Sequence, residues 1–292
     1  MLLPQFLHEK ISNSLILDKN INLMINVIKI GGNVVDNHTL LTQFVSDFAA
    51  LDGPCVLVHG GGVMASQMQR QMGMTPLMVE GRRVTDEETL RIVTMVYAGW
   101  CGKHITALLQ AAGRNAISLS GCDANVIRAD RRPPRMVKTS TASGDVMQPV
   151  DYGFVGDVHA EGVNAQFILQ LLEAGVTPVF NAINHNGQGD LLNTNADTIA
   201  SCVAQALAQH TPTRLIYCFE KPGVLLDKDD DTSIIDTITP AYYAQLKAEG
   251  RVADGMLPKL DNAFAAIAAG VDSVVIKHAM NLGRNIGTTL HA

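Results

Sequence analysis

Residues 28–33 read Ile-Lys-Ile-Gly-Gly-Asn, and residues 58–62 read Val-His-Gly-Gly-Gly. In both stretches a short apolar run, typical of a buried strand, leads directly into glycines. Glycine lets the backbone approach an anion closely, and N–H groups at the start of a following helix point toward such an anion. Two of these loops at the carboxyl edge of one parallel sheet would form a phosphate cradle. The same glycines would also suit tight strand-to-helix turns, and one short motif does not distinguish the two interpretations.

Around these loops the chain alternates short apolar runs with segments of helical periodicity. We expect strands at residues 27–30, 56–58, 116–119, 178–182, 215–218 and 273–276. We expect helices at residues 40–51, 63–72, 87–112, 165–174, 196–209, 241–247 and 255–269. Gly113, Gly175 and Gly270 follow helices as C-caps do, and Thr239 precedes Pro240 as an N-cap does. This alternation predicts an α/β fold around a mostly parallel sheet.

Two places interrupt the alternation. Residues 126–164 contain polar strand-like pieces and the pair Pro133-Pro134, which predict hairpins or a lid outside the core sheet. Residues 210–213 are polar and contain Pro212, and they give the best domain break. We therefore expect an N-terminal lobe over 24–211 and a C-terminal lobe over 212–292. Residues 1–23 form an extension that is either a short amphipathic helix or a flexible leader.

Composition limits the class of protein. The 292 residues are 47% hydrophobic with a formal net charge of −6, and no apolar run approaches the ~18 residues of a membrane span. This predicts a folded protein with neither a membrane nor a nucleic-acid partner, and small-molecule substrates fit better. Five widely spaced cysteines without a C-x-x-C pair predict reduced thiols and a cytoplasmic location. The nucleotide motifs G-x-x-x-x-G-K-[ST] and G-x-G-x-x-G do not fit either glycine loop.

Three further segments carry candidate functional residues. Residues 193–197 read Asn-Thr-Asn-Ala-Asp and open an apolar-periodic helix, where Asn195 also suits an N-cap and Asp197 a first-turn acid. Residues 254–259 read Asp-Gly-Met-Leu-Pro-Lys. Taken alone, Lys259 could also be interpreted as an exposed lysine on a helix. Residues 81–85 read Gly-Arg-Arg-Val-Thr, whose arginines alone would suit a solvated loop.

Together the five segments resemble the amino-acid kinase family, over about residues 26–290 and in the family's order. Within that family the likeness is to the enzymes that phosphorylate N-acetyl-L-glutamate. The resemblance implies a three-layer αβα fold, an N-terminal lobe for the acyl-amino acid and a C-terminal lobe for ATP. It also implies a homodimer formed across the N-terminal lobes and a place in arginine biosynthesis.

The resemblance assigns roles position by position. It implies that Lys29 and Lys259 neutralise the transferring phosphoryl group and that Asp197 orients both. Backbone donors to that group would come from Gly31, Gly32 and Gly61, and the acyl-amino acid would contact Gly61, Gly62, Arg83 and Asn193. The ATP-binding positions would be Glu220, Lys221, Pro222, Gly223, Val224, Leu225, Arg251, Val252, Ala253, Gly255 and Met256.

This set is chemically coherent. The implied acceptor is a side-chain carboxylate, ionised at pH 7 with a reference pKa of ~4.3, so no general base is needed. The reaction instead needs two anions aligned and their repulsion cancelled. Lysines, backbone N–H groups and Mg²⁺ supply that cancellation. The sequence shows no carboxylate cluster suited to a metal, so Mg²⁺ would be held mainly by the ATP phosphates.

Several departures from the family pattern leave alternatives open. Phe219-Glu220 stand where the family usually has Thr/Ser-Asp, and residues 181–185 lack the usual Ala-Pro turn. Arg128, Arg131 and Arg132 make one loop unusually basic, which keeps an N-succinyl-L-glutamate substrate open beside a merely solvated basic lid. A non-catalytic amino-acid sensor of the same fold is a further alternative. The C-terminal residues 277–288 lack the acid and aromatic of arginine-inhibited members, which predicts insensitivity to arginine.

Overall fold

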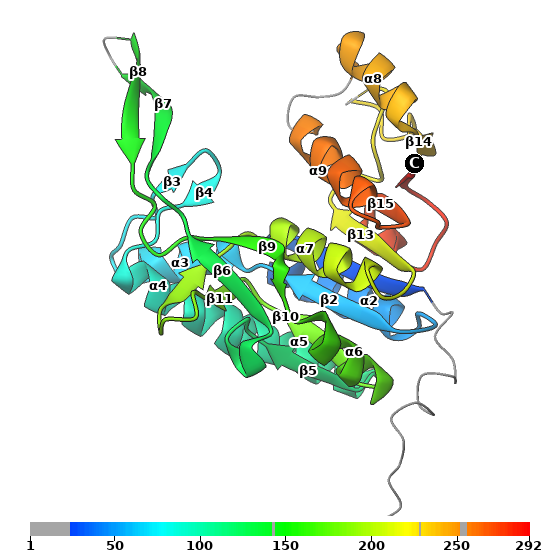
Figure 1. Ribbon diagram of the computed structural model, residues 1–292, viewed down its shortest axis with the longest axis horizontal. Helices are drawn as coiled ribbons and strands as arrows, with labels where there is room; N and C mark the ends of the chain where they lie inside the picture. The colour runs from blue at the N-terminus through cyan, green and yellow to red at the C-terminus, as the bar shows by residue number, and fades with distance from the viewer. Residues whose placement is uncertain (1–23, 142–143, 228, 252–255) are drawn as a thin grey trace, which may run out of the picture.

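The computed structural model describes residues 24–141, 144–227, 229–251 and 256–292 (Figure 1). The expected extension 1–23 lies outside these residues. The core is an eight-stranded sheet in the order β14-β16-β15-β13-β1-β2-β10-β5, parallel except where β15 meets β16. Its strands are β1 (Ile25–Ile30), β2 (Cys55–His59), β5 (Ala116–Leu119), β10 (Thr177–Phe180), β13 (Thr213–Phe219), β14 (Thr237–Ile238), β15 (Ser273–His278) and β16 (Thr288–Leu290). The predicted mostly parallel α/β sheet is confirmed.

Helices cover both faces of this sheet, which explains why its central strands are apolar along their whole length. On one face α7 packs on β1, β2 and β13, with α6 and α9 beside it. On the other face lie α2 and α5, with α1 and α3 next to them (Figure 1). The helices are α1 (Gly32–Asp36), α2 (His38–Ala49), α3 (Gly62–Gln71), α4 (Glu87–Thr94), α5 (Gly102–Ala111), α6 (Ala165–Glu173), α7 (Ala196–Ala208), α8 (Pro240–Ala248) and α9 (Leu257–Ala268). The predicted three-layer αβα arrangement is therefore confirmed.

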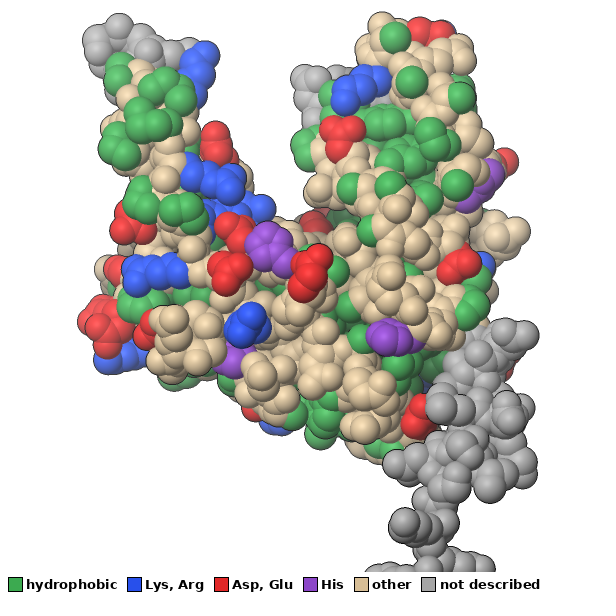
Figure 2. Space-filling view, viewed as in Figure 1, with side chains coloured by type: hydrophobic (Ala, Val, Ile, Leu, Met, Phe, Trp, Pro, Cys, Tyr) green, Lys and Arg blue, Asp and Glu red, His purple; other side chains and the backbone are tan. Residues whose placement is uncertain are grey.

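The predicted hairpin region forms structure outside the core sheet. A four-stranded sheet has the order β12-β11-β6-β9, and β7 pairs with β8 in a hairpin. This hairpin projects from the molecule opposite α8 and α9, and Figure 2 shows the surface hollowed between the two projections. The strands are β3 (Met78–Val79), β4 (Arg82–Arg83), β6 (Ile127–Arg131), β7 (Arg135–Thr141), β8 (Gly144–Val150), β9 (Gly156–Val163), β11 (Ile183–His185) and β12 (Leu191–Asn193).

The helix ends follow the predicted capping. Gly113, Gly175 and Gly270 have φ values of 80°, 72° and 105°, the left-handed region that glycine enters without strain. The Thr239 side chain accepts a hydrogen bond from the Tyr242 backbone N–H at the start of α8. Sequence periodicity missed the five-residue helix α1. It also predicted one regular helix over 87–112, where a π-helical segment, η1 (Met95–Cys101), separates α4 from α5.

The two expected lobes share the central sheet, because β1 pairs in parallel with β13 over six residues. The expected break at 210–213 lies between α7 and β13, and the backbone N–H of Ile25 donates to the carbonyl of Pro212 there. The division into lobes at this point stays a prediction. In the residues described, each helix falls short of the length and apolarity that crossing a membrane requires.

Candidate active site

The two glycine loops lie side by side at the carboxyl edge of the sheet. Strands β1 and β2 pair in parallel with Ile30 opposite His59, so their loops leave the sheet next to each other. Helix α1 starts at Gly32 and α3 at Gly62, immediately after each strand. At Gly61 a Cβ atom would lie 2.8 Å from the Tyr97 ring, so only glycine fits against that ring. The arrangement has the geometry of the predicted phosphate cradle.

The two candidate lysines and Asp197 meet beside these loops. Lys29, near the end of β1, is buried, and its Nζ lies 2.7 Å from Oδ1 of Asp197. Asp197 lies in the first turn of α7, where the Asn195 side chain accepts the N-capping hydrogen bond from Thr198. Lys259 comes from the start of α9. Asn195 and Asp197 thus have the local helix roles the sequence suggested, and the fold adds an ion pair to Asp197.

Burial lowers the pKa of Lys259 below that of a free lysine. The carboxylates of Asp197 and Glu220 raise this pKa in part, whereas the neighbouring charge of Lys29 lowers it further. The two like charges therefore disfavour each other, and the nearby acids offset that repulsion.

Two adjoining cavities share the second glycine loop and Arg83. The larger measures about 610 Å³ and the smaller about 200 Å³. They are hereafter called the phosphate cavity and the acceptor cavity, after the groups that the sequence predicts for their lining residues. The phosphate cavity is lined by residues that include Lys29, Gly31, Gly32, Asn33, Phe219, Glu220, Lys221, Met256 and Lys259. The acceptor cavity is lined by residues that include Arg82, Tyr97, Val155, Ala182, Asn193 and Thr194. Gly60, Gly61, Gly62 and Arg83 line both, so groups held in the two cavities would meet at the glycines.

Arg83 is buried and fixed by several acceptors. Its Nη2 donates to the Gly62 carbonyl and to Ser66 Oγ, both at 2.8 Å, and its Nη1 donates to Gln69 Oε1. The Gln69 side chain in turn donates to Thr89 Oγ1 at 3.1 Å. Sequence reasoning missed Ser66 and Gln69. Their spacing of three residues places them on one face of a helix, which is the only signal the sequence carries for them.

Asn193 lines the acceptor cavity together with the second glycine loop. Its Nδ2 donates to Thr85 Oγ1 at 3.0 Å. Thr85 is fully buried, and its backbone joins the hairpin region through the Tyr152 carbonyl. The structure thus brings together the side chains predicted to hold the acyl-amino acid.

His59 forms a hydrogen bond with the second glycine loop. It is fully buried, and its Nδ1 lies 2.7 Å from the carbonyl oxygen of Gly60. Because a carbonyl oxygen only accepts, Nδ1 carries the proton and the ring donates it. Burial lowers the pKa of His59 to about 4, so the ring is neutral at pH 7.

The expected ATP-binding positions divide into four groups. Glu220, Lys221 and Met256 line the phosphate cavity, and Glu220 accepts a hydrogen bond from the Asn33 side chain. The following residues Pro222, Gly223, Val224 and Leu225 are not among its lining residues; the Val224 backbone N–H donates to Thr288 Oγ1 at 2.8 Å. Arg251 lies 3.4 Å from Glu249. Val252, Ala253 and Gly255 lie outside the described residues.

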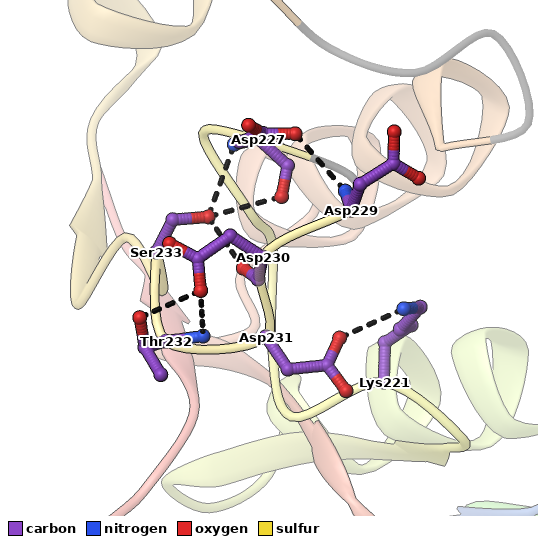
Figure 3. Close-up of polar contacts among 7 residues, drawn as sticks. All are labelled: Lys221, Asp227, Asp229, Asp230, Asp231, Thr232 and Ser233. Carbon is purple, nitrogen blue, oxygen red and sulfur yellow. Dashed lines mark hydrogen bonds and ion pairs between the residues drawn. The ribbon is translucent and has the colours of Figure 1, made fainter.

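An acidic loop beside the phosphate cavity is stabilised by its own hydrogen bonds (Figure 3). The Asp230 carboxylate accepts from the Thr232 backbone and hydroxyl, and Ser233 Oγ accepts from the Asp227 backbone N–H. Asp231 Oδ1 lies 2.7 Å from Lys221 Nζ. Asp227 and Asp230 therefore stabilise the loop. Asp231 pairs with the lysine at the edge of the cavity.

The three arginines of the basic loop do not converge, contrary to the acyl-carboxylate pocket considered from the sequence. Arg132 is buried and pairs with Asp157, whereas Arg131 is exposed with its guanidinium 5.0 Å from the Phe154 ring centroid. Arg128 is exposed and lines a separate cavity with Glu161. Arg128 and Arg131 lie three positions apart on β6, so their side chains point to opposite faces of that strand, and Arg132 follows its end.

The altered turn at 181–185 is an internal hydrogen-bond network. Asn181 is buried, and its Nδ2 donates to the Leu119 carbonyl and to Ser120 Oγ. The buried Asn184 donates to Thr194 Oγ1 at 2.6 Å. These amides form hydrogen bonds with buried backbone and hydroxyl groups. The two asparagines that depart from the family pattern therefore stabilise this turn.

Comparisons with known proteins agree with this geometry. Residues 24–278 match the Amino acid kinase family. The chain is 47% identical over 266 residues to the acetylglutamate kinase of Phocaeicola vulgatus, covering 91% of this chain and 98% of that protein. It is 48% identical over 266 residues to the acetylglutamate kinase of Bacteroides thetaiotaomicron, again covering 91% and 98%.

A solved structure shares the fold at lower identity. It is an N-acetylglutamate synthase from Neisseria gonorrhoeae complexed with coenzyme A and N-acetyl-glutamate. The TM-score is 0.72 at 22% identity, over 92% of this chain and 59% of that one. At this identity the likeness concerns the fold alone.

Proposed function

Since the chain belongs to the amino acid kinase family, we propose that it transfers the γ-phosphoryl group of ATP to the γ-carboxylate of N-acetyl-L-glutamate. The products are an acyl phosphate and ADP, as arginine biosynthesis requires. The observation that carries the proposal is the convergence of Lys29, Lys259 and Asp197 on two glycine loops between adjoining cavities. The relatives named above are kinases named for the acetyl compound. They favour neither the N-succinyl alternative nor a non-catalytic sensor.

The acceptor cavity suits an acyl-amino acid. Arg83 offers a guanidinium fixed by its hydrogen bond to the Gly62 carbonyl, and Asn193 offers an amide in the same cavity. Both would hold the α-carboxylate of the substrate, leaving the γ-carboxylate directed to Gly61 and Gly62. That carboxylate is ionised at pH 7 and attacks phosphorus without losing a proton.

The phosphate cavity suits the triphosphate of ATP. Gly31, Gly32 and Gly61 supply backbone donors where negative charge develops, and the two lysines approach the same region. Asp197 pairs with Lys29, and its carboxylate partly offsets the lowering of the Lys259 pKa by burial, so it counters the repulsion between the two lysines. Binding and alignment, rather than acid–base chemistry, then account for catalysis.

Mg²⁺ fits this site only together with the nucleotide. Among the described residues no group of three or more His, Cys, Asp or Glu side chains is placed to hold a metal ion. Glu220 is the carboxylate on the wall of the phosphate cavity beside Asn33, and these two would face a cation carried by the phosphates. When bound, Mg²⁺ would neutralise charge on the phosphate oxygens.

We also propose a cytoplasmic homodimer formed across the N-terminal lobes. Met95 and Trp100 of η1 are 56% and 59% exposed, and they would be covered by a second copy of the chain packed against this segment. All five cysteines are free thiols, as a reducing compartment maintains them.

The reaction is tested by trapping its product. Purified protein is incubated with Mg²⁺, ATP and hydroxylamine, which converts an acyl phosphate into a coloured hydroxamate. N-acetyl-L-glutamate should give hydroxamate and an equal amount of ADP. N-succinyl-L-glutamate, L-glutamate and L-aspartate should give much less at equal concentration. ADP release without hydroxamate, or a preference for another acceptor, would contradict the proposal.

A further inference from the structure

Phe219, the last residue of β13, lies close to both lysines of the site. Its ring centroid is 3.8 Å from Lys259 Nζ and 5.3 Å from Lys29 Nζ. An ammonium group within about 6 Å of a ring face is attracted by the negative charge of the π system. Both cations invoked for phosphoryl transfer therefore contact one aromatic side chain.

For Lys259 the ring is the main close partner. Lys29 has Asp197 Oδ1 at 2.7 Å, whereas among the described residues the close contact of Lys259 Nζ is the Phe219 ring, with no ion pair or hydrogen bond beside it. Asp197 and Glu220 act on Lys259 only at longer range. A lysine with four rotatable side-chain bonds and no hydrogen-bond acceptor would otherwise sample many rotamers.

The ring itself is held in place. Tyr217 stacks against Phe219 with centroids 5.7 Å apart and an interplanar angle of 12°. The Tyr217 hydroxyl donates to the backbone carbonyl of Asp197 at 3.2 Å. Strand β13 is paired on both sides, with β1 and with β15. The aromatic face is thus fixed relative to both Lys29 and Asp197.

We propose that Phe219 is a positioning residue for phosphoryl transfer, whose ring face holds the Lys259 ammonium, and more weakly that of Lys29, at the phosphate cavity. The inference rests on the proposed kinase function.

The first test compares substitutions that keep or remove the π face. Phe219→Leu keeps an apolar side chain without aromatic charge, whereas Phe219→Tyr and Phe219→Trp keep the π face. We expect kcat to fall about 3- to 30-fold in the leucine variant, with KM for N-acetyl-L-glutamate within about twofold. The tyrosine and tryptophan variants should stay within about threefold of wild-type kcat.

A second test leaves the shape unchanged. Phenylalanine analogues with one, two and three ring fluorines are incorporated at position 219, because each fluorine weakens the negative face with little change in size. We expect kcat to decrease stepwise with fluorine number. This series tests the inference even where the leucine variant does not fold.

The pH profile separates positioning from a merely structural role. The charged groups acting on Lys259 are Asp197, Lys29 and Glu220. The ring favours the protonated lysine, so its loss should move the alkaline limb of kcat to lower pH in Phe219→Leu and not in Phe219→Tyr. Phe264→Leu is the matched control, since Phe264 lies on the same helix as Lys259 but stacks on Tyr243, away from the site.

Wild-type kcat in Phe219→Leu would overturn the inference. So would equal losses in the leucine, tyrosine and tryptophan variants, or a fluorine series without a trend. A wild-type chain that forms no acyl phosphate would instead contradict the proposed function, a failure seen before any variant is made.

Discussion

At the scale of single residues, Lys29 and Lys259 are the positive charges expected to act on the transferring phosphoryl group. Both should stabilise the transition state more than bound substrate, because negative charge moves onto the oxygens between them during transfer. We expect Lys29→Ala and Lys259→Ala each to lower kcat by ~10² or more, with smaller effects on KM. Arginine should not restore either, because its planar fork places the charge differently. Steady-state kinetics measure this.

Lys247→Ala is the control for these substitutions, since Lys247 is a half-exposed lysine paired with Asp261 on the outer side of α8 and α9. It should retain wild-type kcat. A folded Lys259→Ala variant with near-normal kcat would remove that lysine from the mechanism.

Gln69 tests whether a fixed Arg83 binds the acceptor. Gln69→Leu removes the acceptor of Arg83 Nη1 and leaves the arginine less well oriented. We expect KM for N-acetyl-L-glutamate to rise about tenfold, corresponding to ~1.4 kcal/mol, with kcat within a few-fold. Gln67→Leu on the exposed side of α3 is the control. An unchanged KM in Gln69→Leu, with KM for ATP altered instead, would show that Arg83 does not hold the acceptor.

His59 predicts a pH dependence of stability. Its pKa is lowered from 6.5 to about 4 in the folded chain, so between these values the unfolded chain binds a proton that the folded chain does not. The free energy of unfolding should therefore fall as pH decreases from 6.5 toward 4, by up to about 3 kcal/mol from this group. Urea unfolding at several pH values should show a smaller decrease for His59→Asn. Parallel decreases in both proteins would assign the effect to other groups.

At the scale of elements, the turn from β2 into α3 depends on one close contact. A Cβ at Gly61 would meet the Tyr97 ring at 2.8 Å, whereas one at Gly60 would meet nothing within 4 Å. We expect Gly61→Ala to lower the free energy of unfolding by about 1–3 kcal/mol and to reduce activity, and Gly60→Ala to cost much less stability. Denaturant unfolding of the two variants decides this. Equal stabilities would mean that the ring moves aside.

The same turn shows what periodicity could not predict. Tyr97 lies in η1, inside the segment that the sequence predicted as one regular helix. A π-helical segment has the same kind of apolar residues as an α-helix, so composition does not reveal it. Its different winding changes which residues lie on one face. The contact of Gly61 with Tyr97 and Cys101 therefore appeared only in the structure.

At the scale of the whole molecule, assembly and regulation can be tested together. In the C-terminal segment, the Lys277 ammonium donates to the carbonyls of Asn281, Leu282 and Arg284 at 3.1, 3.3 and 2.7 Å. With a lysine there and no carboxylate for a guanidinium, an arginine effector would lack a bidentate partner. We expect a homodimer whose activity is unchanged by millimolar arginine. Light scattering beside an activity titration measures both.

Trp100→Glu would place a charge on the proposed dimer surface and should shift the mass toward the monomer. Glu173→Gln, a change at an exposed position of helix α6, is the control. A hexamer, inhibition by arginine, or a Trp100→Glu protein of unchanged mass would each contradict part of this prediction.

The sequence by itself determined the parallel α/β sheet and the helix caps. Through the resemblance of its short motifs it also indicated Lys29, Lys259, Asp197, Arg83 and both glycine loops as site residues, and their roles stay predictions. These features are local: apolar periodicity, capping chemistry and short motifs depend on residues close together in the chain. It could not determine that Gln69 fixes Arg83, that three neighbouring arginines diverge, or that Phe219 contacts both lysines. The contact of Phe219 with Lys29 depends on the pairing of β1 with β13, which joins residues 190 positions apart, and its contact with Lys259 depends on where α9 lies. The bond from Arg83 to Gln69 likewise depends on how β4 lies against α3. Only the tertiary structure decides such contacts, because side-chain geometry across distant elements leaves no periodic trace in the sequence.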